Sequence, residues 1–185
     1  MLSAAKHQPG RRAARSSGLR AGIRIFEAPR LILRCAQDRL LFTMSTITAL
    51  FDDYAAYHQT PGNKAFHRLG IPMIMLSLIG MLVHVKLGPV DAAIVLIVMA
   101  ELYYLTIEWR LAILMLLVSA AFYFLGAYLG LWVNVALFVL GWIFQFIGHK
   151  VYEHKNPAFF RNFVHLLVGP LWILNGFIPV VKHRA

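Results

Sequence analysis

Two short segments of the chain carry histidines at a spacing that suits a metal site. The first holds His58 and His67, which stand nine residues apart on either side of a Pro-Gly pair. The second holds His149, with Glu153 four residues further on. Neutral imidazoles with a carboxylate suit Fe(II), Mn(II) or Zn(II), and two histidines with one carboxylate leave Fe(II) the open positions that oxygen activation requires. The two segments form a candidate metal site wherever the fold brings them together.

The first segment lies between two predicted helices. Apolar residues within 47–54 recur at helical intervals, so an amphipathic helix ends near the Pro-Gly pair and carries His58 on its apolar side. Asn63 is placed to cap a second helix, which carries His67. Spacing alone also fits a plainer interpretation, in which both histidines are hydrogen-bonded residues near a membrane interface.

The second segment is predicted to end a long apolar helix. Gln145, His149 and Glu153 follow one another at intervals of four, so they share one helix face. His149 and Glu153 fit a structural pair as well as a metal site. His165 is a further candidate ligand, because the predicted topology places it near the same membrane face.

Composition indicates a membrane protein. The chain is 59% hydrophobic and only 14% charged, whereas soluble domains carry about 25% charged residues. No Asp, Glu, Lys or Arg occurs from Leu111 to Gly148, a length that would extend roughly 57 Å as a helix. One membrane span needs only about 30 Å, so this stretch holds two spans or one long buried hairpin.

Glycine, proline and polar residues divide the apolar sequence into successive segments. We predict an all-α polytopic membrane helical bundle with four spans plus a broken fifth or re-entrant segment, the third and fourth spans being joined near Gly130 and Asn134. The predicted spans are 70–85, 90–107, 111–130 and 131–148, and the broken segment is 163–181. Glu101 lies inside the second span, where a carboxylate is a functional candidate.

Loop charges predict the orientation of these spans. Lys64 and Arg68 precede the first span and Lys150 follows the fourth. The positive-inside rule therefore places both histidine segments on the cytoplasmic face of an integral, multi-pass protein. His84, at the far end of the first span, is expected on the other face. Lys64, Arg68 and Lys150 are also placed to attract an anionic group of a substrate.

The first 43 residues differ from the rest of the chain. They hold Lys6 and eight arginines against two acidic residues, so most of the net charge of +10 belongs to this segment. We interpret residues 1–43 as a disordered basic extension ahead of a start at Met44, a transit-like peptide being the alternative, and residues 44–185 as the membrane-embedded domain. This distribution argues against nucleic acid as a partner. The single cysteine excludes thiolate metal clusters.

The two histidine segments together resemble the family of membrane 2-hydroxy fatty acid dioxygenases, formerly a domain of unknown function. The resemblance spans residues 47–175 and runs through YHQTPGNKAFHRLGIP and GWIFQFIGHKVYEHKNPAFFRNFVHLLVGP. In this family a fungal endoplasmic-reticulum member is an Fe(II)-dependent dioxygenase that shortens 2-hydroxypalmitic acid by one carbon in fatty acid α-oxidation. The residues that match the family pattern are His58, His67, His149, Glu153, Asn63 and Asn162.

The resemblance implies Fe(II) as the cofactor, a 2-hydroxy fatty acid and O₂ as substrates, and membrane lipid as the surroundings. With the predicted topology, it points to one iron held by three histidines, His58, His67 and His149. Supporting roles fall to Glu153, as fourth ligand or as acceptor for a ligand N–H, and to Asn63 and Gln145, as hydrogen-bonding groups.

One departure from the family pattern stands in the last apolar segment. Family members often carry a Glu shortly after the Gly-Pro pair, where this chain reads LWILNG over residues 171–176.

The predicted function is removal of one carbon from 2-hydroxy fatty acids by a non-haem iron dioxygenase. The alternatives are a small membrane transporter with Glu101 in its path and a non-catalytic membrane scaffold with structural histidines. The sequence leaves the oligomeric state open.

Overall fold

The computed structural model describes residues 46–154 and 163–182, all of which belong to the unit Gln37–Ala185. The predictions for residues 1–43 and for Asn162 fall outside these ranges. The described residues are helical apart from short connections and one hairpin, in which β1 (Lys86–Leu87) pairs antiparallel with β2 (Val90–Asp91). The predicted all-α fold class is confirmed for this part of the chain.

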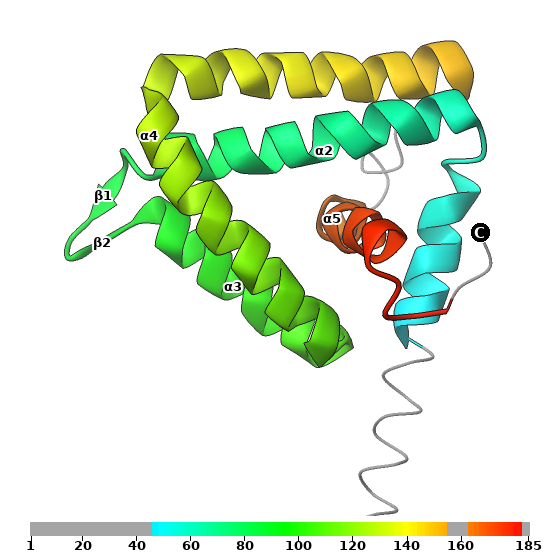
Figure 1. Cartoon of the computed structure of the whole chain (residues 1–185), viewed down its shortest axis with the longest axis horizontal. Coiled ribbons are helices and arrows are strands. Elements are labelled where there is room, and N and C mark those ends of the chain that lie inside the picture. Colours follow the sequence, from blue (N-terminus) through cyan, green and yellow to red (C-terminus); the bar gives the residue numbers. More distant parts are fainter. Residues whose placement is uncertain (1–45, 155–162, 183–185) are drawn as a thin grey trace, which may run out of the picture. The chain divides into compact units, whose positions relative to one another are not determined.

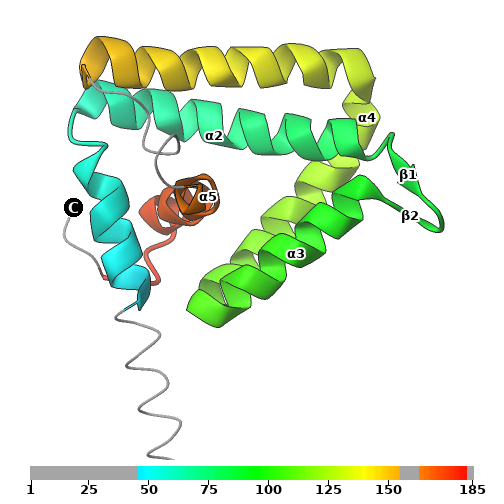
Figure 2. The same cartoon turned by 180° about the vertical axis from the view of Figure 1, so that it is seen from behind.

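Figure 1 shows how the helices are arranged. The described chain begins in a helix at residues 46–56. The helices that follow are α2 (Pro61–Leu82), α3 (Ala92–Ile107), α4 (Trp109–Ile147), the π-helix η1 (Gly148–Tyr152) and α5 (Val164–Phe177). Both views show α2 beside the second part of α4 and α3 beside its first part, with α5 next to the helix at residues 46–56 (Figures 1 and 2).

Helix α2 starts at the Pro-Gly pair that the sequence suggested as a helix end. Pro61 fits the first helical position because it has no N–H to leave unpaired there. The N-cap is Thr60, whose side-chain oxygen accepts a hydrogen bond from the backbone N–H of Asn63 at 3.3 Å. The expectation that Asn63 is the cap is therefore wrong, and its side-chain amide instead donates to the carbonyl of Tyr57 at 3.3 Å.

Helix α4 bends sharply at Gly130. The backbone there has φ 75° and ψ 171°, a conformation that only glycine adopts readily. The side-chain amide of Asn134 spans the bend by donating to the carbonyls of Gly126 (2.7 Å) and Gly130 (2.8 Å). The predicted junction near Gly130 and Asn134 is confirmed, and the bend lets one continuous helical stretch pack first on α3 and then on α2.

Glycines bring α2 and α4 into backbone contact. A Cβ atom placed on Gly126 would lie 2.6 Å from the Cα of Gly80, and one placed on Gly141 would lie 3.1 Å from the carbonyl oxygen of Gly70. Close approach of this kind supplies the van der Waals contact that holds helices together where lipid removes the hydrophobic drive between them. It fixes the position of α2 along both parts of α4.

Two helical stretches are long and apolar enough to cross a membrane. These are Pro61–Leu82 and Trp109–Tyr152, the second being the one that bends at Gly130. Helix α3 has 16 residues and α5 has 14, fewer than the roughly 20 that a full span needs. The structure thus supports a helical protein with two long apolar stretches, and the count of four spans stays a prediction.

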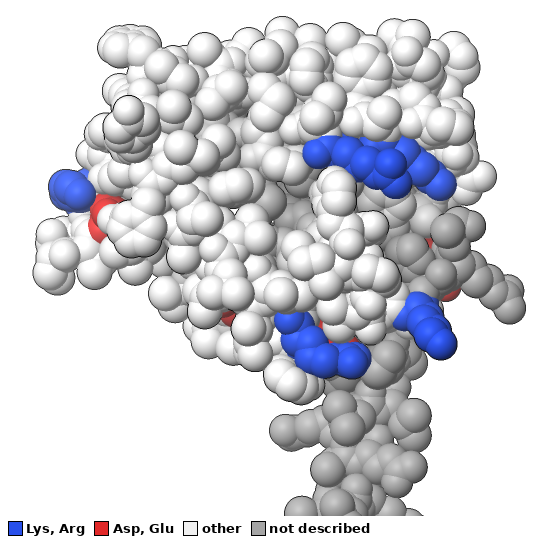
Figure 3. Space-filling model, in the orientation of Figure 1, with Lys and Arg blue, Asp and Glu red and all other residues white. Residues whose placement is uncertain are grey.

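The outer faces of these helices are apolar. Large side chains stand exposed along α4, including Phe124 (72%) and Trp132 (80%). Figure 3 shows lysine and arginine gathered at a few places, a few small acidic spots, and uncharged surface over most of the described part of that face. Contiguous exposed apolar surface of this kind marks contact with lipid or with another protein.

The backbone contact between α2 and α4 predicts an asymmetry between two small substitutions. Gly126→Ala places a methyl group against Gly80 and should lower the free energy of unfolding by about 1–3 kcal/mol. Gly176→Ala is the matched control, because a Cβ there meets nothing within 4 Å. Thermal unfolding in detergent measures both. Equal stability of the two variants would show that the glycine crossing does not hold the helices together.

Candidate metal centre

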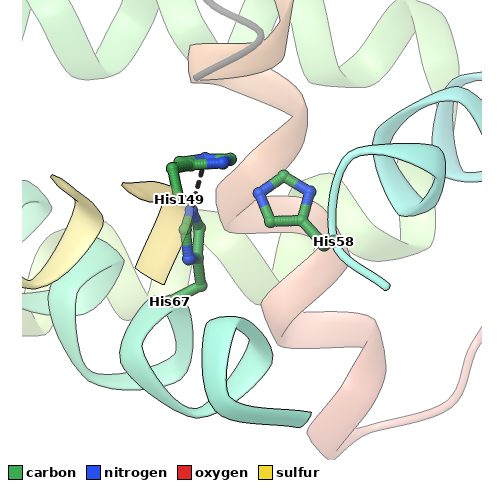
Figure 4. A group of neighbouring side chains, drawn as sticks. All are labelled: His58, His67 and His149. Atoms are coloured by element: carbon green, nitrogen blue, oxygen red, sulfur yellow. Dashed lines mark hydrogen bonds between the residues drawn. The ribbon is translucent and has the colours of Figure 1, made fainter. Parts of the chain in front are cut away.

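Three elements of the fold, two consecutive and one distant in sequence, bring three histidines together. His58 follows the helix at residues 46–56, His67 lies in the second turn of α2, and His149 lies in η1. All three side chains are buried, and one ring nitrogen of each lies within 4.8 Å of the others. Figure 4 shows the ring of His58 facing the pair formed by His67 and His149. The structure therefore assembles the predicted trio.

Backbone carbonyls orient two of the three rings. The Nδ1–H of His58 donates to the carbonyl of Tyr54 at 2.7 Å, and the Nδ1–H of His67 donates to that of Asn63 at 3.0 Å. In both cases the acceptor stands four residues earlier. A hydrogen bond at Nδ1 fixes the tautomer and leaves the Nε2 lone pair for a metal. Both rings thus have the arrangement that is usual for metal-bound histidines.

The ring of His149 contacts that of His67. His149 Nε2 lies 3.1 Å from His67 Nε2 and, since the proton of His67 is on Nδ1, it is His149 that donates in this hydrogen bond. If two histidine nitrogens bind one metal ion at an angle of about 90°, each at roughly 2.1 Å from it, the two nitrogens are about 3 Å apart. This separation fits a shared ion. Binding all three Nε2 atoms requires His149 to carry its proton on Nδ1 instead.

A ring nitrogen of His58 without a hydrogen-bond partner also suits a metal site. The Nε2 atom of His58 is buried and has no hydrogen-bond partner among the described residues. A buried polar atom without a partner costs free energy, and a metal ion would give this lone pair a partner. Burial, with a smaller contribution from nearby His149, lowers the pKa of His58 to about 4. The ring is therefore neutral at pH 7, as a ligand must be.

The π-turn of η1 sets the position of His149. The N–H of Glu153 donates to the carbonyl of Gly148, five residues earlier, at 3.2 Å. In an α-helix it would donate to the carbonyl four residues earlier. Such turns occur frequently at functional sites. A side chain on Gly148 would meet Asn63 and His67, so glycine lets η1 approach α2. The common face expected for Gln145, His149 and Glu153 is interrupted here: the first two line the cavity beside the histidines, and Glu153 does not.

Glu153 contacts the start of α2. Its Oε1 atom accepts hydrogen bonds from the backbone N–H (2.7 Å) and the hydroxyl (3.2 Å) of Thr60. Burial acts to raise the pKa of Glu153, but the hydrogen bonds from Thr60 and Asn63 outweigh it and hold that pKa below its usual value. The ionised carboxylate thus anchors the N-terminus of α2. The close group of ring nitrogens does not include it.

The trio lines one wall of a cavity of about 80 Å³, which we call the histidine cavity. The other polar groups in its lining are Tyr54, Gln145 and His165. Tyr54 stacks on the ring of His58, with ring centroids 4.1 Å apart. The apolar remainder comes from α2, α4 and α5, and is Ile71, Ile74, Met75, Trp142, Leu166, Gly169 and Pro170.

Comparison with known proteins bears directly on these residues. Residues 44–179 match the model of a family described as 2-hydroxy-palmitic acid dioxygenase Mpo1-like. The chain belongs to the Mpo1-like family. It is 34% identical over 141 residues to the 2-hydroxy-palmitic acid dioxygenase MPO1 of Saccharomyces cerevisiae, an alignment that covers 70% of this chain and 81% of the yeast protein. No solved structure matches the chain. The resemblance drawn from the two histidine segments is confirmed.

His165 has a different partner in this Mpo1-like chain. Its Nε2 atom lies 2.7 Å from the carboxylate of Asp53, and it is not one of the three clustered histidines. Because its Nε2–H donates to Asp53, its Nδ1 lone pair is unused by any described residue. The two residues lie 112 positions apart, so no local sequence pattern could have revealed the pair. Tyr54 could have been found, since it precedes His58 by one helical turn.

Other predicted residues lie outside the histidine cavity. Glu101 is buried in α3 and is not part of the cluster. His84 is exposed. Lys64 and Arg68 line a separate hollow of about 560 Å³ together with Lys182, so the structure does not place them beside the histidines.

The departure from the family pattern lies outside the lining of the histidine cavity, although the ring centroid of Trp172 is 6.0 Å from that of His58. None of residues 171–176 lines the histidine cavity. Four of them line the hollow that also contains Lys64, Arg68 and Lys182, namely Trp172, Ile173, Asn175 and Gly176. Asn175 is buried and folds the turn after α5 by accepting from the N–H groups of Val180 (2.9 Å) and Val181 (2.8 Å). The missing Glu therefore removes no group from the described lining of the histidine cavity.

Glu153→Gln separates an anchoring role from a ligand role. The substitution keeps the shape of the side chain but removes its charge, so it should lower the free energy of unfolding by about 1–3 kcal/mol and leave bound metal unchanged. The difference from the parent should narrow as the pH falls through the lowered pKa of Glu153, because the parent carboxylate is then protonated too. Asp52→Asn, at an exposed position, is the control. Metal loss with unchanged stability would instead make Glu153 a ligand.

Proposed function

We propose that this protein is an Fe(II)-dependent dioxygenase that removes one carbon from 2-hydroxy fatty acids, with His58, His67 and His149 as the metal ligands. The observation that carries the proposal is the buried group of three ring nitrogens within 4.8 Å, one of them without any described partner. Family membership adds the reaction class, because the yeast relative is named a 2-hydroxy-palmitic acid dioxygenase.

The proposed overall reaction needs no further reductant. A 2-hydroxy acid and O₂ give a fatty acid one carbon shorter, CO₂ and water: the bond between the carboxyl carbon and the hydroxyl-bearing carbon breaks, and the four electrons lost by the substrate reduce O₂. Bound Fe(II) would supply open positions for O₂ and for the substrate's carboxylate and hydroxyl. The protein residues provide orientation and a site shielded from water.

Protein groups that line the histidine cavity with the trio suit the polar end of such a substrate. The Gln145 amide is buried in the lining of the histidine cavity, and its Nε2 has no hydrogen-bond partner among the described residues. It is placed to donate to a carboxylate. The Nδ1 atom of His165, held by the bond from His165 to Asp53, is placed to accept a hydrogen bond from the hydroxyl. The apolar lining limits access of water to both groups.

The membrane placement is part of the proposal. We infer an integral, multi-pass protein with the histidine segments on the cytoplasmic face, supported by two long apolar helical stretches and by the basic residues near the start of α2. A membrane position also suits the substrate, since a long-chain 2-hydroxy acid partitions into lipid.

Iron content tests the ligand assignment. His58→Ala, His67→Ala and His149→Ala should each lose most of the bound iron, because three protein ligands leave little redundancy, whereas His84→Ala should retain it. The measurement is iron per protein after anaerobic purification in detergent, with folding checked by thermal unfolding. Full iron in folded variants of the trio would contradict the assignment.

Single cysteines test the sidedness. In a Cys35→Ser background, cysteines at the exposed positions Gln59 and His154 should react with an impermeant thiol reagent from the cytoplasmic side. A cysteine at exposed Lys86, in the hairpin beyond the other end of α2, should react only from the opposite side. Labelling of Gln59 and His154 from different sides would overturn the proposed topology.

A further inference from the structure

A second cavity adjoins the histidine cavity. It has a volume of about 140 Å³ and lies between α2, the first part of α4 and α5. Every residue that lines it is apolar: Ile71, Pro72, Met75, Met115, Val118, Phe122, Pro170, Ile173, Leu174 and Phe177. We call it the apolar cavity. A site without a polar group can bind a hydrocarbon but offers no partner to a charged or hydrogen-bonding ligand.

The two cavities share a wall. Ile71 and Met75, one turn apart on α2, and Pro170 on α5 line both of them. Methionine is unbranched and flexible, so its side chain moves at little cost and adapts to irregular space. A change of the Met75 rotamer would therefore open or close a passage between the histidine cavity and the apolar cavity.

The apolar cavity reaches the surface at its other end. Phe177, which ends α5, lines it while remaining 67% exposed, and Phe122 on α4 is half-buried. Nearby α4 residues such as Leu117 are also exposed and apolar. The two cavities thus lie one after the other between the buried ring nitrogens and an apolar part of the protein surface.

We infer that the apolar cavity binds the acyl chain of the acid whose carboxyl end lies at the three histidines. The inference rests on the proposed function for the identity of that acid. The wall that the two cavities share places the apolar cavity next to the histidines. Its apolar lining suits a hydrocarbon chain, since each methylene buried there leaves water or the interface for an apolar site. Met75 controls the passage, and Val118, Leu174 and Phe177 limit how far the chain extends.

A filling substitution tests the chain site against a matched control. Val118→Phe adds a ring inside the apolar cavity, whereas Val139→Phe makes the same change at an exposed position in the second part of α4. With the long substrate 2-hydroxypalmitic acid, Val118→Phe should raise KM roughly tenfold or more. With the short substrate 2-hydroxyoctanoic acid, the same variant should leave KM nearly unchanged. Val139→Phe should alter neither. Leu174→Phe, which narrows the cavity from α5, replaces Val118→Phe should that variant fail to fold.

Crosslinking provides a readout that needs no turnover. A 2-hydroxypalmitic acid analogue with a photoreactive group at its terminal carbon is bound to the full chain in anaerobic detergent, irradiated and mapped by mass spectrometry. Labelling at the apolar cavity, displaced by free 2-hydroxypalmitic acid, supports the chain site even if no carbon is lost, in which case the proposed reaction alone fails. Turnover with labelling spread over outer faces of α3, or displaced equally by phospholipid, overturns the chain site alone.

Discussion

Helix α2 touches the backbone of α4 because glycines stand where the two helices meet. Gly80 lies against Gly126 and Gly70 against Gly141, and at the end of the same seam Gly148 brings η1 up to His67. The 3.1 Å separation between the ring nitrogens of His67 and His149 follows from this seam. A side chain on Gly148 would meet Asn63 and the ring of His67.

A second constraint fixes the position of His58. Glu153 follows the π-turn and accepts hydrogen bonds from the backbone N–H and the hydroxyl of Thr60, so one carboxylate connects the end of the α4 stretch to the start of α2. Thr60 lies two residues after His58 in the connection between the first two helices. The carboxylate therefore positions the connection that carries His58, and it supports the trio through the backbone.

The sequence predicted which histidines come together better than it predicted the contacts that support them. The types and spacing of His58, His67 and His149 indicated a shared site, and the predicted chain reversal near Gly130 brought the two segments to one side. The π-turn, the role of Glu153 and the partnership of His165 with Asp53 depend on contacts between distant segments. Periodicity reports only local structure, which is why it predicted a common face for Gln145 and Glu153.

The fold class could likewise be predicted from the sequence, whereas the lengths of the shorter helices could not. Apolar content and the absence of charge from Leu111 to Gly148 were sufficient to predict a helical protein and a break near Gly130. The lengths of α3 and α5 depend on where Asp91 and Glu108 cap their helices and on how Asn175 folds the last turn. Helix ends of this kind are set by hydrogen bonds of single side chains, and a hydropathy pattern carries no information about such bonds.

The proposed centre is one iron held by three imidazoles, and X-ray absorption at the iron edge of the full chain tests it directly. Anaerobically loaded protein should show nitrogen or oxygen neighbours at roughly 2.1 Å from the iron, together with the more distant scattering of three imidazole rings. This ring scattering should diminish in His67→Ala. A spectrum without imidazole scattering, or one with sulfur from Cys35 bound to the iron, would contradict the proposed centre.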